Sequence, residues 1–283
     1  MSFLSPGPLT SLHRPTRPRL FAVDVDGTLL TSQHTVTDAV RDAVETARER
    51  GSEVLLTTSR PPRALWPILE FLGLLVPAAF IGSQGGLVGS YSPEGHLVVL
   101  ERHPMPLDLA RDAVAAASRA GLAVNWFSGE EWFVSEMDDQ VRREAEIVAC
   151  EPVVTNLATL TAPPEKLLVI APPGRAADLE DIVTALSAGV RAQTSNPTYL
   201  EITASAVDKA AALRDFCAGR GIAPEAVVAI GDGMNDLGMF RFAGTAVAPA
   251  NARPEVRAAA HLITTSNDED GVAHALEELS VPG

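Results

Sequence analysis

Short apolar runs alternate with amphipathic segments near the start of the chain. The runs at residues 20–25, 53–56 and 78–81 have the length and composition of strands that are buried on both faces. Residues 38–50 carry apolar side chains at helical spacing, and Gly51 marks the end of that helix. This alternation predicts an α/β fold built on a doubly wound parallel sheet.

The pattern changes in the middle of the chain. There "GLAVNWFSGEEWFVSE" and "VRAQTSNPTYLEIT" each read as two strands around a turn, which indicates antiparallel pairing. The α/β alternation returns with a helix at 209–220 and a strand at 226–230, so the middle segment reads as an insertion. The expected division is a loose N-terminal tail at residues 1–19, a core at 20–87 and 204–283, and an inserted α/β domain at 88–203.

Charge interrupts the first apolar run. Asp24 lies inside the run, and its carboxylate would be costly to bury without a cation or hydrogen-bond donors. An ordinary turn next to Gly27 explains Asp26 better than it explains Asp24. Ligands of open α/β sheets gather at the carboxyl ends of the strands. A reactive site is therefore expected at the end of this strand.

The composition narrows the classes of function. With 283 residues, 46% of them hydrophobic, the chain is long enough for a large core or for two domains. A net charge of -14 argues against a nucleic-acid surface. Cys150 and Cys217 are too few for a disulfide framework, which favours a reducing cytoplasm, and no apolar run is long enough to suggest a membrane role.

Polar residues follow several of the expected strands or begin a helix. Taken singly, each has an ordinary explanation as a helix cap, a solvated lysine or a turn residue. In sequence order, "DVDGTLL", "TTSR", "DKAAAL" and "IGDGMNDLGMF" resemble the four motifs of the haloacid dehalogenase (HAD) superfamily, in the branch of Cof-type phosphatases with a type IIB (C2B) cap. The resemblance spans about residues 20–279 and implies a Rossmann-like core with an inserted cap domain.

The resemblance also implies an activity and its residues. It implies a Mg²⁺-dependent phosphatase that hydrolyses small phosphorylated metabolites, such as sugar phosphates, through an aspartyl phosphate. Asp24 would be the nucleophile and Asp26 the general acid and base. The magnesium ligands would be Asp24, the backbone carbonyl of Asp26, Asp232 and, from further out, Asp236. The phosphoryl oxygens would be bound by Thr58, Lys209 and Asn235.

Three positions depart from the family pattern. Ser59 and Ala210 replace glycines, and Gln84 replaces an asparagine. None of them removes a catalytic group, but Ser59 and Gln84 can alter the shape of the loops that meet the substrate. Two alternatives to the phosphatase stay open, a phosphomutase of the same superfamily and a non-catalytic protein that binds phosphometabolites. Glu201 is expected in a structural salt bridge, and the aromatic residues near Trp126 are expected in the cap core.

Overall fold

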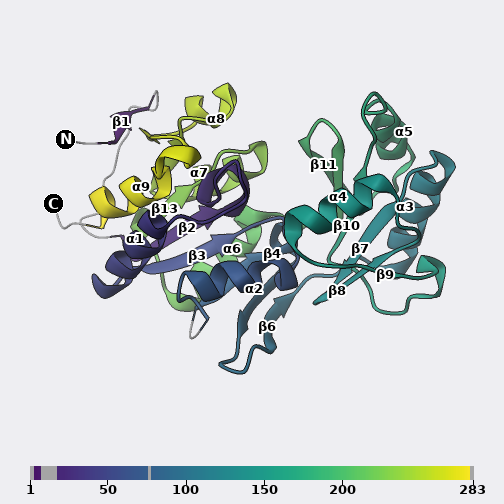
Figure 1. Ribbon diagram of the computed structural model, residues 1–283, viewed down its shortest axis with the longest axis horizontal. Coiled ribbons are helices and arrows are strands. Elements are labelled where there is room, and N and C mark those ends of the chain that lie inside the picture. The colour runs from purple at the N-terminus through teal and green to yellow at the C-terminus, as the bar shows by residue number, and fades with distance from the viewer. Residues whose placement is uncertain (1–2, 8–17, 76–77, 281–283) are drawn as a thin grey trace.

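The computed structural model describes residues 3–7, 18–75 and 78–280, which form two lobes side by side (Figure 1). A nine-stranded sheet forms the larger lobe. Its central strands run parallel, in the spatial order β15 (Leu262–Thr264), β14 (Thr245–Pro249), β13 (Val227–Ile230), β2 (Leu20–Asp24), β3 (Glu53–Thr57) and β4 (Ala79–Gly82). Antiparallel strands extend both edges, namely β1 (Ser5–Pro6) beside β15 and the hairpin of β5 (Leu87–Tyr91) and β6 (Leu97–Arg102) beside β4.

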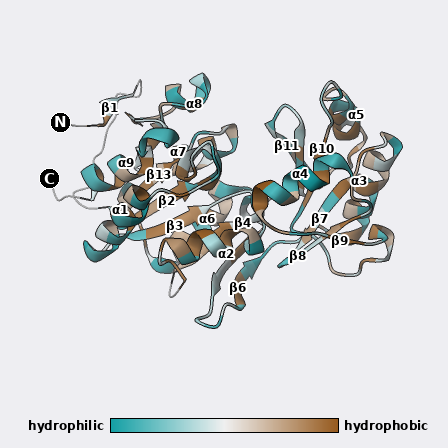
Figure 2. Cartoon of the chain, viewed as in Figure 1, coloured by the Kyte–Doolittle hydropathy of each residue, from teal (hydrophilic) through white to brown (hydrophobic). Residues whose placement is uncertain are grey.

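Helices cover both faces of this sheet. Along β2, Phe21 and Val23 point to one face and Leu20 and Ala22 to the other, as the period of a strand requires. The first pair packs with α1 (Asp38–Glu49), α2 (Pro62–Phe71) and α9 (Gly271–Leu279). The second packs with α6 (Lys209–Arg220), α7 (Leu237–Phe242) and α8 (Pro254–Ala258). The predicted doubly wound α/β fold is confirmed, with its apolar strands between polar-faced helices (Figure 2).

The smaller lobe, which we call the cap, holds a six-stranded sheet. Its order is β11 (Val190–Asn196), β12 (Tyr199–Ala204), β10 (Lys166–Ile170), β7 (Val124–Ser128), β8 (Glu131–Val134) and β9 (Val153–Val154). The helices α3 (Leu107–Arg119) and α5 (Asp178–Ala185) pack on one face, and α4 (Asp139–Val148) packs on the other. Both expected hairpins are present, as β7 with β8 and β11 with β12.

Alternation along the cap strands separates an apolar face from a mixed face. Leu167 and Leu200 pack under α3 and α5 together with Trp126, which is fully buried. The neighbouring residues of the same strands, Lys166 and Glu201, point to the opposite face. Phe127 and Trp132 are also buried, so the structure supports their expected place in the cap core.

The boundary of the insertion differs from the expected one. The expected insertion includes residues 88–102, but β5 and β6 belong to the large sheet. Val88 is buried in the core because β5 pairs with β4. Antiparallel pairing is thus a property of this sheet edge as well as of the cap, which begins after Arg102. The other boundary, at residues 203 and 204, lies at the end of β12.

Part of the expected N-terminal tail is ordered. Ser5 and Pro6 pair with Ile263 and Leu262 of β15, whereas residues 1–2 and 8–17 of that tail lie outside the described residues. None of the helices in the described ranges is long and apolar enough to cross a membrane.

Candidate active site

The predicted residues meet at the carboxyl edge of the central strands. Asp24 is the last residue of β2, and Thr58 and Asp232 follow β3 and β13. The register pairs Val23 with Ile230, and Asp24 with Thr57. These three neighbouring strands therefore end side by side. Ligand sites of parallel sheets lie at this edge, outside the carboxyl ends of the strands.

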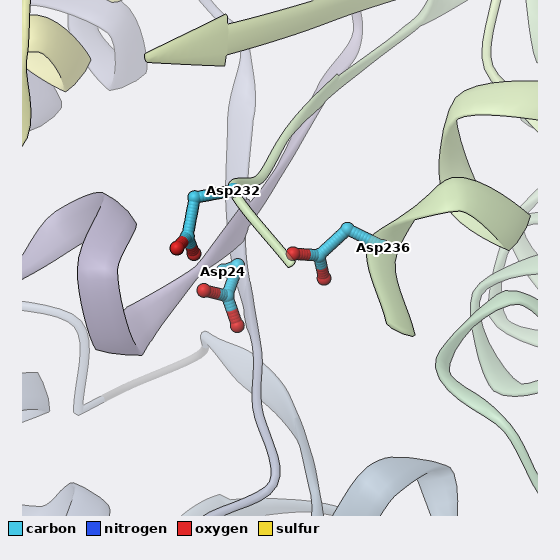
Figure 3. A group of neighbouring side chains, drawn as sticks. All are labelled: Asp24, Asp232 and Asp236. Carbon is cyan, nitrogen blue, oxygen red and sulfur yellow. The ribbon is translucent and has the colours of Figure 1, made fainter. Parts of the chain in front are cut away.

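Three carboxylates converge at this edge. Asp24, Asp232 and Asp236 each offer an oxygen within 4.8 Å of the others, and Figure 3 shows their side chains directed toward one another. The Thr28 hydroxyl donates to Asp232 Oδ1 at 3.0 Å, and the Gly233 N–H donates to Asp236 Oδ2 at 2.9 Å. Local hydrogen bonds thus fix the orientation of two of the three carboxylates.

Lys209 binds two of these carboxylates. Its Nζ lies 2.5 Å from Asp24 Oδ1 and 2.8 Å from Asp236 Oδ1, and its side chain is fully buried. It is the first residue of α6, and Asp208 caps that helix by accepting from the Ala211 N–H. Burial alone would lower the pKa of Lys209, but the Asp236 and Asp24 carboxylates outweigh it and raise that pKa above its ordinary value. Lys209 is therefore a permanent positive charge.

A glycine permits the close approach of the first loop to the metal-binding edge. Gly27 has a φ of +78°, and a Cβ built at this position would lie 2.5 Å from Asp232 Oδ2. Any other residue would both strain the backbone and displace that carboxylate. Packing at the site therefore requires the glycine of "DGT".

The carboxylates carry more negative charge than Lys209 offsets. Burial, followed by repulsion from Asp236, raises the pKa of Asp24 well above its ordinary value. Burial and Asp236 likewise raise the pKa of Asp232 to about 6. A buried group of hard oxygen donors with surplus negative charge fits a divalent cation such as Mg²⁺. The site thus fits a metal, with Asp24, Asp232 and Asp236 as the residues that would hold it.

Asp26 is held by a residue that the sequence analysis missed. Arg60 Nη2 lies 2.7 Å from Asp26 Oδ1, and Arg60 Nε lies 2.9 Å from Asp26 Oδ2, which makes a bidentate pair. Burial would lower the pKa of Arg60, but Asp26 raises it overall. The available signal was the position of Arg60, directly after Thr58 and Ser59 in "TTSR".

The expected phosphate-binding residues occupy different depths. Asn235 lines the cleft, and its Nδ2 donates to Gln84 Oε1 at 3.3 Å. Thr58 is fully buried, and its hydroxyl accepts from the Arg60 N–H at 3.0 Å. Lys209 is buried against Asp24 and is not among the residues that line the cleft. The structure therefore brings all the predicted residues to one site, with Asp24, Asp26, Asp232 and Asn235 at its surface.

A cleft of about 260 Å³ separates these residues from the cap. The wall on the cap side combines charged, polar and apolar side chains, namely Glu144, Ile147, Val148, Lys166, Leu168, Ser195, Asn196, Tyr199 and Glu201. Lys166 and Glu201 are both buried, and Lys166 Nζ lies 3.6 Å from Glu201 Oε1. The expected salt bridge of Glu201 thus exists. The signal for Lys166 was a charge at the start of the apolar run "KLLVI".

Comparisons with known proteins agree with this architecture. The family model of the haloacid dehalogenase-like hydrolases matches residues 21–276. YxeH of Bacillus subtilis (strain 168) is 30% identical over 275 residues, which cover 92% of this chain and 98% of that protein. The pyridoxal phosphate phosphatase YbhA of Escherichia coli (strain K12) is 27% identical over 270 residues, which cover 90% and 96% of the two chains.

Solved structures share the whole fold. The crystal structure of a haloacid dehalogenase-like hydrolase from Bacteroides thetaiotaomicron has a TM-score of 0.83 at 28% identity, covering 93% of this chain and all of that one. A HAD subclass IIB sugar phosphatase has a TM-score of 0.80 at 20% identity, which extends the likeness in fold to the cap type. The chain therefore belongs to the haloacid dehalogenase-like hydrolases, as a phosphatase of the Cof type.

Proposed function

We propose that this enzyme hydrolyses small phosphate monoesters with Mg²⁺, through an aspartyl phosphate on Asp24. The observation that carries the proposal is the group of three aspartates, two of them paired with the buried Lys209, which opens on a cleft roofed by the cap. Such a site can neutralise a phosphoryl group while it presents a carboxylate oxygen to the phosphorus.

In the first step a carboxylate oxygen of Asp24 forms a bond to phosphorus. The bond between phosphorus and the ester oxygen breaks, and the electron pair leaves with that oxygen. Asp26, two residues further along the chain, supplies the proton that this oxygen takes up. The products are a free alcohol and a phosphorylated Asp24.

In the second step the Asp26 carboxylate takes a proton from water as the water oxygen attacks the phosphorus. The bond to Asp24 breaks, inorganic phosphate forms, and Asp26 is left protonated for the next cycle. The bidentate pair with Arg60 holds Asp26 in a fixed orientation for this proton transfer.

Fixed charges stabilise the phosphoryl group in both steps. Lys209 supplies a point charge beside Asp24, and Asn235 and Thr58 would donate hydrogen bonds to phosphoryl oxygens. A magnesium ion held by Asp24, the Asp26 carbonyl, Asp232 and Asp236 would supply the remaining positive charge for the spreading phosphoryl charge.

The cleft favours small hydroxylated leaving groups. Its volume of about 260 Å³ limits their size, and Glu144, Lys166, Tyr199 and Glu201 offer partners for hydroxyl groups on the cap side. Relatives named for their substrates act on small molecules, pyridoxal phosphate in one case and 5-amino-6-(5-phospho-D-ribitylamino)uracil in another. Sugar phosphates and similar phosphorylated metabolites are the substrates that we propose.

A phosphate-release screen tests the proposal. The panel contains sugar phosphates, nucleotides, pyridoxal phosphate and a phosphoprotein, each with Mg²⁺ and with excess chelator. We expect release from several small esters, little from the phosphoprotein, none with chelator, and inhibition by Ca²⁺, which accepts more ligands at longer distances. Undiminished release in chelator would contradict the metal dependence. Turnover that requires a bisphosphate activator would favour the phosphomutase instead.

A further inference from the structure

Gln84 lies in a strained loop between the two lobes. It follows β4 in the core and has a φ of +61°, and Ser83 before it has a φ of +50°. Two successive non-glycine residues in the left-handed region are unfavourable, and such strain persists only where surrounding contacts over-determine it. The Gln84 side chain is also buried, at 2% exposure. Its contacts therefore need an explanation.

Both ends of the Gln84 amide are engaged. Its Nε2 donates to Glu201 Oε2 on the cap strand β12. Its Oε1 accepts from Asn235 Nδ2, on the core loop after β13, at 3.3 Å. One side chain thus joins a buried carboxylate of the cap to an amide that faces the phosphoryl position.

The same cap carboxylate leads back to the core. Glu201 Oε1 lies 3.6 Å from Lys166 Nζ, and that Nζ donates to the backbone carbonyl of Ser59 at 2.6 Å. Because β10 and β12 are neighbours, Lys166 and Glu201 share the face that roofs the cleft. The contacts form a chain from Ser59 through the cap to Gln84 and Asn235, which we call the cleft chain. Its two core ends flank the proposed phosphate site.

We propose that Gln84 is a positioning residue that latches the cap over the cleft and couples cap closure to the orientation of Asn235. The effect on phosphate binding rests on the proposed function, whereas the latch between lobes does not. An asparagine at this position would be one methylene shorter and could not keep both contacts from the same backbone. Gln84 thereby links recognition of the leaving group to binding of the phosphoryl group.

Exchanging the two partners tests the latch. Gln84→Glu alone places two carboxylates against each other, and the double variant Gln84→Glu with Glu201→Gln restores one donor and one acceptor. In small-angle X-ray scattering, we expect a larger radius of gyration for the single variant and the wild-type value for the double variant. Gln140→Glu, a half-buried cap glutamine outside the cleft chain, is the matched control and should scatter like the wild type.

Inhibition by inorganic phosphate tests the coupling. Gln84→Glu loses the hydrogen bond to the Glu201 carboxylate. We expect both the inhibition constant of phosphate and KM to rise by about tenfold to a hundredfold in this variant. The double variant should return to within about threefold of the wild type. A role confined to the loop fold would instead lower the melting temperature in both variants without rescue.

Several results would overturn the proposal. An unchanged radius of gyration in Gln84→Glu would show that Gln84 does not latch the cap. A larger radius with an unchanged inhibition constant of phosphate would show that cap closure is not coupled to phosphate binding. Failure of the double variant to recover would also overturn the proposal. If Gln84→Glu does not fold, Gln84→Asn replaces it and must open the cap. A wild type that releases no phosphate would refute the proposed function, but scattering would still decide the latch.

Discussion

The core and the cap bring charge to the cleft by different means. In the core, Asp24, Thr58 and Asp232 come from the ends of parallel strands, and Lys209 from the start of a helix. In the cap, Lys166 and Glu201 come from one face of an antiparallel sheet. The positions of strand ends are fixed by the topology of the sheet, whereas side chains on a sheet face that lines a cleft are less constrained by it. We therefore expect the core to carry the reaction and the cap to carry the choice of substrate.

Substitutions in the two lobes should therefore have different signatures. Core residues are proposed to contact the phosphoryl group, which all candidate substrates share, so their loss should lower turnover on every substrate alike. Cap residues that line the cleft without joining the cleft chain are proposed to contact the leaving group, so their loss should change the order of preferred substrates. The predictions below test this division from the largest expected effect to the smallest.

The largest effect is expected from Asp24→Asn. An amide has nearly the same shape as the carboxylate but is a poor nucleophile, so kcat should fall by at least about 10⁴-fold on every substrate while the protein stays folded. Steady-state phosphate release measures the loss, and circular dichroism checks the fold. Retention of wild-type turnover would disprove the aspartyl phosphate mechanism.

A smaller loss is expected from Asp26→Asn. The backbone carbonyl proposed to bind the metal remains, but the proton is gone, and general acid and base catalysis is typically worth about 100- to 10,000-fold. Substrate should still bind, which equilibrium dialysis with a phosphate ester can measure. If kcat fell by less than about tenfold, another group would have to transfer the proton.

Arg60→Met should cost about 10- to 100-fold in kcat, because Asp26 loses two charge-assisted hydrogen bonds. Arg60→Lys keeps the charge without the fork and should recover only part of the loss. Arg41→Met is a matched control, since Arg41 also pairs with an aspartate, Asp38, but on the surface. Equal kinetics for the Arg60 and Arg41 variants would show that the pair with Asp26 has no role in turnover.

The sequence predicted the core better than the cap site. Asp24 could be found because it breaks an apolar run at the end of a strand, whereas Lys209 and Asp232 were found through the resemblance of their motifs to those of the family. The structure brings the three residues together. Arg60 was missed because an arginine that follows a strand does not interrupt an apolar run. The contacts of Lys166 and Gln84 depend on how the two lobes meet, a long-range geometry that local patterns do not contain.

The predicted start of the insertion, at residue 88, was wrong for a related reason. Period-2 alternation identifies a strand but not the sheet that it joins, and β5 pairs with β4 of the core rather than with the cap. The hairpins β7–β8 and β11–β12 were correct because the turns that define them are local in sequence. Local pairing is therefore readable from the chain, whereas membership of a sheet requires the fold.

The smallest effect is expected from Tyr199→Phe in the cap. The Tyr199 hydroxyl donates to Glu144 Oε2 at 2.9 Å, and both side chains line the cleft. Burial raises the pKa of Glu144, and the hydrogen bond from Tyr199 offsets part of that rise. Without the hydroxyl, the cap wall loses one neutral donor and a hydrogen bond to a carboxylate, while Asp24 and Lys209 keep their contacts.

We therefore expect Tyr199→Phe to change the ratios of kcat/KM among small esters by up to about tenfold, the effect of one such hydrogen bond, and to leave kcat on the best substrate within about threefold. Tyr91→Phe is the matched control, because the Tyr91 hydroxyl also donates to a cap glutamate, Glu130, at 3.2 Å but outside the residues that line the cleft. It should leave the ratios unchanged. A uniform fall of kcat on all substrates in Tyr199→Phe would show that this cap residue acts like the core residues. The proposed division of roles between the two lobes would then be wrong.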